Sequence, residues 1–123
     1  MEEKANIKNT KETLREARRM LRSDPLMRLA SLRDSLGAFF GGDFDGGKLH
    51  LRNVVKYGIG YDALVLETGI SMQSINRMLS RRGNPTTKHL FAILRAIRKY
   101  EGFEMRMQVV IKSTAKQNAG SSH

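Results

Sequence analysis

Apolar residues recur at helical spacing along the N-terminal third of the chain. From Asn9 or Thr10 to Arg22 they stand among many charged residues, which predicts a polar, weakly amphipathic helix. Ser23-Asp24-Pro25 predicts the start of a second helix, because a capping residue followed by proline favours the first helical turn. We expect this helix to run to about Phe40. Its expected apolar face carries leucines and one of two phenylalanines: Leu26, Leu29, Leu32, Leu36 and Phe39 or Phe40.

Glycine then interrupts the helical pattern. Four glycines surround Asp43-Phe44-Asp45 and predict a loop at 41–47, because glycine destabilises regular structure. Apolar spacing resumes at Leu49 and predicts a short helix that ends at Gly58. This loop is expected to separate an N-terminal helical segment from the rest of the chain.

Three further helices are expected in the second half of the chain. Two short ones cover Tyr61–Thr68 and Ser71–Leu79, with Gly69 between them. A turn at Gly83-Asn84-Pro85-Thr86 follows, in which Thr86 is expected to cap a helix that continues to Tyr100. The expected buried face of that last helix is aliphatic: Leu90, Ile93, Leu94 and Ile97.

Beyond Gly102 the period of the pattern changes from helical to alternating. Residues 103–112 alternate apolar and polar side chains, which predicts a β-strand with one apolar face. No other segment alternates over a comparable length, so the simplest partner is the same strand of a second copy. The alternatives are that the strand covers its own helices or joins a partner protein's sheet. The expected dimer face comprises Phe103, Met105, Met107, Val109 and Ile111.

The organisation expected from these elements has four parts. Residues 1–47 form an N-terminal helical segment with the glycine-rich loop, and 48–102 form the main helical domain. Residues 103–112 are the dimerisation strand, and 113–123 are a polar, disordered tail.

Composition excludes several classes of protein. The chain has no cysteine, which excludes a disulfide scaffold, a thiol nucleophile and cysteine-ligated metal centres. It has no apolar run near the length of a membrane span and no apolar leader segment, so a soluble, cytoplasmic protein is expected. The two internal histidines lie apart from any paired ligand. We therefore expect no metal, no cofactor and no enzymatic activity.

The charge points to a polyanionic partner. The formal net charge is +10, and residues 48–100 hold ten Lys and Arg against two acidic residues. This excess of positive charge in the second half of the chain is typical of nucleic-acid binding.

The Tyr61–Leu79 segment has the spacing of a helix-turn-helix motif. Gly69 can take the left-handed conformation that the turn needs, and Ser71 can cap the second helix. The outward side of that helix carries side chains suited to base edges or phosphates: Ser71, Met72, Gln73, Ser74, Asn76 and Arg77. Three bases flank the following turn and are expected to contact phosphates: Arg81, Arg82 and Lys88. The alternative is an ordinary helix pair with a solvated polar face.

The segment from Leu51 to Val110 resembles the XRE/Cro-like helix-turn-helix regulators, and among them the HigA-type antitoxins, which are addiction module antidote proteins. The resemblance rests on ETGIS at Glu67–Ser71, GNPT at Gly83–Thr86 and LFAILRAI at Leu90–Ile97. It implies a mainly α, lambda-repressor-like bundle, dimeric and without catalysis, with the helix from Ser71 in the major groove. With the alternating segment, the expected fold is this helical bundle plus a C-terminal β-strand. The chain departs from the family at Val65, where alanine or glycine is usual.

The function expected from these features is that of a homodimeric transcriptional repressor that binds a palindromic operator in double-stranded DNA. The resemblance further implies that it is the antitoxin of a type II toxin–antitoxin module, which regulates its own operon and neutralises a RelE/HigB-like RNase toxin. Two alternatives stay open: a stand-alone regulator of the same type with no toxin, and a protein-interaction module without DNA binding.

Overall fold

The computed structural model describes residues 2–113, with side chains from Asn9 onward, and its described part is mainly helical. This confirms the expected mainly α architecture. The helices of the described part are α1 (Glu2–Ser23), α2 (Pro25–Phe40), α3 (Phe44–Tyr57), α4 (Tyr61–Thr68), α5 (Met72–Met78) and α6 (Thr87–Glu101). The expected tail begins at residue 113, and from residue 114 onward it lies outside the described residues.

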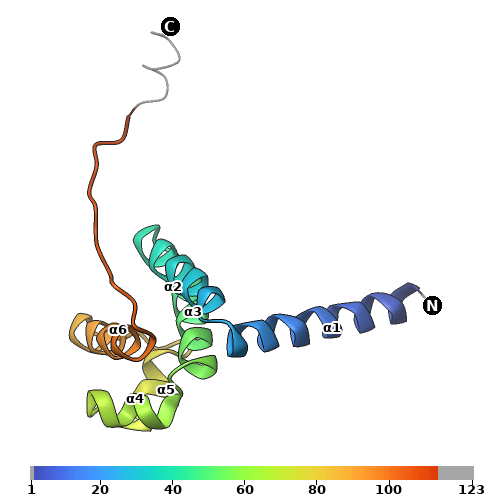
Figure 1. The fold of residues 1–123 in the computed structure, drawn as a ribbon, viewed down its shortest axis with the longest axis horizontal. Coiled ribbons are helices and arrows are strands. Elements are labelled where there is room, and N and C mark those ends of the chain that lie inside the picture. Colours follow the sequence, from blue (N-terminus) through green and yellow to red (C-terminus); the bar gives the residue numbers. More distant parts are fainter. Residues whose placement is uncertain (1, 114–123) are drawn as a thin grey trace, which may run out of the picture.

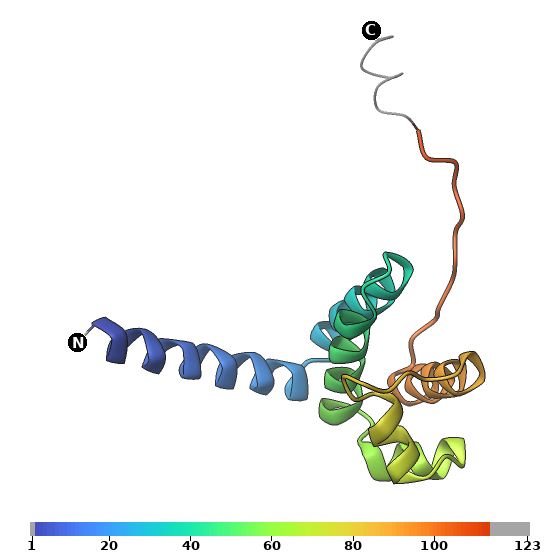
Figure 2. The same ribbon diagram turned by 180° about the vertical axis from the view of Figure 1, so that it is seen from behind.

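Helix α1 projects from the other helices, as Figures 1 and 2 show from opposite sides. The side chains of residues 9–20 are all exposed, so only the last turns of α1 meet the bundle. The helix begins at Glu2, earlier than the expected Asn9 or Thr10. Glu, Lys and Ala fill most of these first positions, and their high helix propensity favours a longer helix.

Helices α2–α6 share one apolar core. Helix α2 packs along α3, and α4, α5 and α6 close around the second half of α3 (Figure 1). Leu26, expected on the buried face of α2, is instead 70% exposed, because it lies in the first turn beyond the packed surface. The central side chains are fully buried: Leu51, Val54, Leu64, Ile75, Leu79, Ile93 and Ile97.

The glycine-rich loop is shorter than expected, and the prediction of a loop over 41–47 was wrong in its second half. Helix α3 already begins at Phe44, because the Asp43 side chain accepts a hydrogen bond from the N–H of Gly46 at 2.9 Å. Helix-start capping of this kind offsets the low helix propensity of the glycines. Gly47 is buried in this helix, and its carbonyl accepts a 2.7 Å hydrogen bond from the Ser35 hydroxyl.

The C-terminal strand is absent from the described residues, so the prediction of a strand over Phe103–Lys112 was wrong for the single chain. The segment leaves α6 at Gly102 and extends away from the bundle (Figures 1 and 2). A strand needs a hydrogen-bonded neighbour, and the described part of the chain offers none. The alternation of side chains thus gives an extended backbone without a sheet.

Candidate nucleic-acid interface

The three residues between α4 and α5 shape a tight corner. Gly69 has a φ of 72°, in the left-handed region that favours glycine, and its N–H donates to the Val65 carbonyl at 2.8 Å. Ile70 is buried beneath the corner at 8% exposure. Ser71 caps α5, its hydroxyl accepting a hydrogen bond from the N–H of Ser74 at 3.1 Å. The corner conformation and cap expected from the sequence are confirmed.

Val65, on the inner side of α4, does not prevent this close packing. Its side chain is half-buried and packs against the common core. The neighbouring Leu64 is completely buried. The β-branched side chain is therefore accommodated within the packing of α4.

The outer face of α5 is polar and largely free. Ser71, Gln73, Asn76 and Arg77 are exposed, whereas Met72 and Ser74 are half-buried. The Ser71 hydroxyl also donates to that of Ser74 at 2.9 Å. In the described part of the chain, the side chains of Gln73, Asn76 and Arg77 have no hydrogen-bond or ion-pair partner. Their polar groups are available to a ligand.

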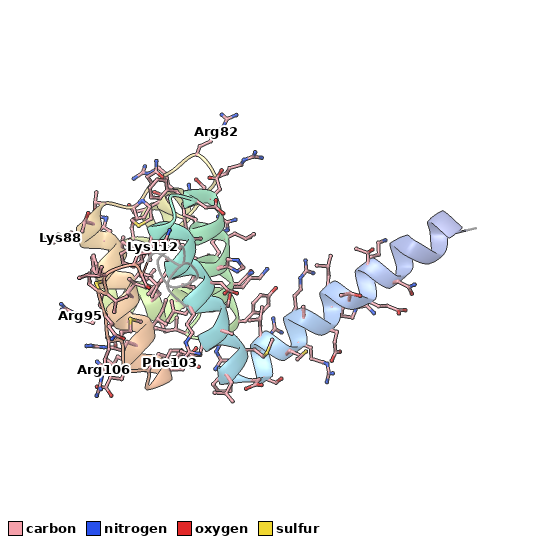
Figure 3. All side chains as sticks on the ribbon, turned by 90° about the horizontal axis from the view of Figure 1, so that it is seen from above. Arg82, Lys88, Arg95, Phe103, Arg106 and Lys112 are labelled. Carbon is pink, nitrogen blue, oxygen red and sulfur yellow. The ribbon has the colours of Figure 1, made fainter. Side chains whose placement is uncertain are left out.

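The connection from α5 to α6 carries two exposed arginines, Arg81 and Arg82, and we call it the basic loop. Lys88 is also exposed and follows in the first turn of α6. Figure 3 shows Arg82 projecting from the edge of the molecule, with Lys88 farther along toward α6. Gly83 lets the loop fold back, because an added Cβ would lie 1.8 Å from the Arg77 carbonyl oxygen. Arg81 and Arg82 thus follow α5 directly, whereas Lys88 stands at the start of the next helix.

Lys48 is buried, although its charge was expected on the anion-facing surface. Its side chain is 2% exposed, and its Nζ donates to the carbonyl oxygens of Ser80, Arg81 and Gly83 at 2.9, 3.0 and 2.6 Å. Arg52, one turn farther along α3, donates to the Leu79 carbonyl. Both bases therefore hold the end of α5 and the basic loop in place.

Sequence reasoning missed this arrangement, although a signal was present. Lys48 shares the helical face of Leu51 and Val55, both completely buried. A lysine on such a face must bring its charge to a partner, because an unpaired buried charge is strongly unfavourable.

The expected dimerisation residues divide into two groups. Phe103 and Met105 are half-buried against the core, whereas Met107, Val109 and Ile111 are 70, 87 and 96% exposed. Beside the extended segment runs an apolar groove of about 650 Å³ between α2 and α6. Its apolar lining includes Leu36, Phe39, Phe40, Leu90, Phe91 and Leu94.

Two kinds of site were not found in the described part of the chain. No group of three or more His, Asp or Glu side chains there is placed to hold a metal ion. None of its helices combines the length and the apolar character needed to cross a membrane. Comparison with protein-family models, with curated proteins and with solved structures gave no match.

Proposed function

We propose that this protein is a sequence-specific DNA-binding transcriptional repressor in which α4 and α5 form a helix-turn-helix motif. The observation that carries the proposal is the unpartnered face of α5, where Gln73, Asn76 and Arg77 stand exposed next to the basic loop. Amide and guanidinium groups are the side chains that pair with base edges in the major groove. Helix α5 is the proposed recognition helix, and α4 crosses the DNA backbone.

Two side chains are placed to read bases together. Gln73 and Arg77 are four residues apart on a helix, so they project from the same face of α5. A glutamine can pair with adenine and an arginine with guanine, each through two hydrogen bonds. Arg81, Arg82 and Lys88 then contact phosphates and hold α5 in register without reading sequence.

Replacing Gln73 or Arg77 with alanine is expected to weaken specific binding by about 1–3 kcal/mol, because each change removes a bidentate base contact. Both residues are exposed, so folding should not change. The DNA is the upstream intergenic duplex, or a site selected by the wild-type protein from random duplexes. Fluorescence anisotropy at one salt concentration gives the affinities.

A matched control for this measurement is Arg95→Ala, which removes an exposed arginine from α6 and should leave specific affinity unchanged. Unchanged affinity in both Gln73→Ala and Arg77→Ala would rule out α5 as the recognition helix. A wild-type protein that binds no duplex would favour the interaction-module alternative.

The proposed repressor acts as a homodimer joined through residues 103–112. Four apolar side chains of this segment are more than two-thirds exposed, and its extended backbone lacks a sheet partner among the described residues. An exposed unpaired edge readily pairs with another chain. The same segment of a second copy, antiparallel across a two-fold axis, satisfies these backbone groups and covers the apolar groove. Such a dimer presents two α5 helices to a palindromic operator.

Met107→Pro is expected to convert the dimer to a monomer, because proline removes a backbone donor from the pairing. Met107 is 70% exposed in the single chain, so the substitution should leave the fold of the monomer unchanged. Light scattering on the wild type at tens of micromolar should give a dimer. Lys112→Pro, at the end of the segment, is the comparison variant and should weaken the dimer less than Met107→Pro. A monomeric wild type would contradict the homodimer and favour pairing with another protein's sheet.

The resemblance extends the proposal to an antitoxin partnered by a RelE/HigB-like RNase toxin. If so, a small basic reading frame is expected beside this gene. Its product should be toxic, and co-expression of this chain should neutralise that toxicity. A neighbouring gene of another kind would favour the stand-alone regulator.

A further inference from the structure

A second basic surface lies where the base of α1 meets the end of α3. A hollow of about 450 Å³ opens there, and all of its charged lining residues are positive. We call it the basic hollow; it is lined by Arg15, Arg18, Arg19, Arg22, Lys56 and Tyr57. These residues come from two helices, so the folded chain gathers charges that are far apart in the sequence.

Most of this positive charge is not neutralised by the protein. Arg19 pairs with Glu16, its Nε donating to Oε2 at 3.1 Å, and the pair is exposed. Arg15, Arg18 and Lys56 have no ion-pair partner among the described side chains. Like charges held close together repel one another, so an anion in the hollow would be favourable.

Tyr57 organises the floor of the basic hollow. The residue is 8% exposed, and its ring lies 5.4 Å from the Arg22 guanidinium and 5.5 Å from the Lys56 ammonium. Cation–π attraction holds these two charges at the ring despite their mutual repulsion. The Tyr57 hydroxyl has no hydrogen-bond partner within the described chain and can donate to a ligand oxygen.

We infer that the basic hollow binds backbone phosphates of the DNA outside the bases contacted by α5, an inference that rests on the proposed function. Tyr57 ends α3 only a few residues before α4, the helix that crosses the DNA backbone in the proposed complex. Lys48 ties the basic loop to the start of α3, whereas Tyr57 ends that helix, so the basic loop and the basic hollow lie toward opposite ends of α3. Figure 3 likewise shows the base of α1 at the end of the bundle away from Arg82. In the proposed complex the two surfaces contact different stretches of the DNA backbone, and α1 acts as a phosphate-binding arm.

The test compares pairs of neutralising substitutions in the full chain. Arg18→Gln/Lys56→Gln removes two charges from the basic hollow, while Arg95→Gln/Arg98→Gln removes two exposed charges from α6. Figure 3 places Arg95 on the side of the bundle away from α1. Arg81→Gln/Arg82→Gln is the positive reference. Affinity for the selected duplex and for a random duplex is measured over a range of salt concentrations.

The basic-hollow variant is expected to reduce the salt slope by about two, as two lost phosphate contacts should. Its preference for the selected duplex over the random one should persist, and the α6 control should keep the wild-type slope. A wild-type slope in the basic-hollow variant overturns the inference but leaves the proposed function standing. If the wild-type protein binds no duplex, both the proposed function and this inference are overturned.

Vesicles of phosphatidylserine and phosphatidylcholine provide the remaining comparison, because a lipid headgroup also presents phosphate. Loss of vesicle binding in the basic-hollow variant, with an unchanged salt slope on DNA, would overturn the inference in favour of a membrane surface. Circular dichroism of every variant should match the wild type, since the substituted side chains are exposed.

Discussion

Lys48→Met is expected to lower the free energy of unfolding by about 1–3 kcal/mol, the range for leaving buried hydrogen-bond acceptors without their donor. The methionine fills a similar volume but donates no hydrogen bond. Three carbonyl oxygens, which now accept from Lys48 Nζ at 2.6–3.0 Å, would lose their donor. The ammonium also lies 3.6 Å from the Asp45 carboxylate, but that carboxylate is 66% exposed, so loss of this pair should contribute little.

The effect should reach the proposed DNA interface as well as the stability of the fold. The three carbonyls belong to Ser80, Arg81 and Gly83, within the connection that carries the proposed phosphate contacts. Without Lys48 this loop loses its anchor to α3, so we expect weaker DNA binding even at temperatures where the variant is folded. The loop conformation thus depends on a charge buried more than thirty residues earlier in the chain.

Urea unfolding followed by circular dichroism gives the change in stability, at one protein concentration because the proposed dimerisation would also contribute. Lys56→Met is the matched control on the same helix. Lys56 is exposed, and its loss should lower stability by less than about 1 kcal/mol. If Lys48→Met proved as stable as the wild type, the Lys48 hydrogen bonds could not be what holds the loop.

The sequence predicts the α4–α5 corner well because its signals are local. Gly69, Ile70 and Ser71 each act on neighbours within a few residues, through backbone conformation, burial and capping. The exposed face of α5 follows directly from the helical period once the buried positions are known. This is why the candidate base-reading residues could be identified without knowledge of the rest of the fold.

Interactions between distant residues could not be predicted in this way. The helical face of Lys48 indicates its burial but not its partners, because the Ser80 and Gly83 carbonyls are backbone atoms that no side-chain pattern reveals. The basic hollow likewise depends on the position of α1 against α3, which brings Arg18 near Lys56. Sequence spacing shows the helices but not the angle at which they meet.

Two of the incorrect predictions, the loop at 41–47 and the strand at 103–112, have opposite physical causes. At 41–47 the glycine content suggested a loop, but the Asp43 cap and the burial of Gly47 favour helix. Here tertiary packing overrides local propensity. At 103–112 the alternation correctly indicates an extended backbone, but pairing requires a second edge that the described chain does not contain. The pattern therefore describes a surface suited to association rather than an element of the single chain.

A buried ion pair between Arg28 and Glu101 joins the parts of the molecule that carry the two basic surfaces. Arg28 Nε and Nη2 donate to the two Glu101 carboxylate oxygens at 2.6 and 2.9 Å, and the side chains are 8 and 2% exposed. Hydrogen bonding to Glu101 raises the pKa of Arg28, which keeps the guanidinium charged. Arg28 Nη1 also donates to the carbonyls of Leu21 and Arg22, at the end of α1. One arginine thereby links α1, α2 and the end of α6.

Close packing leaves this pair little room to rearrange. An added Cβ at Gly58, after α3, would lie 2.5 Å from Glu101 Oε2 and 3.0 Å from Arg28 Cδ. Neither water nor a larger neighbouring side chain could readily replace a lost partner there. A buried charge left without its partner is strongly destabilising, even where replacement of both partners is tolerated.

Glu101→Gln is therefore expected to lower the free energy of unfolding by about 3–5 kcal/mol, because it leaves the Arg28 charge buried beside a neutral amide. Arg28→Met should have an effect of similar size. The double variant Arg28→Met/Glu101→Gln should lose clearly less than the sum of the two, since neither charge is then stranded.

Arg106→Met is the control, because the Arg106–Glu104 pair is 81 and 73% exposed and should contribute less than about 1 kcal/mol. Urea unfolding of the wild type, the two single variants and the double variant completes the cycle, and additive losses would show that the two charges do not stabilise each other. In Arg28→Met, the carbonyls of Leu21 and Arg22 in α1 also lose the hydrogen bonds that Arg28 donates, so the salt slope on DNA should fall toward that of the basic-hollow variant.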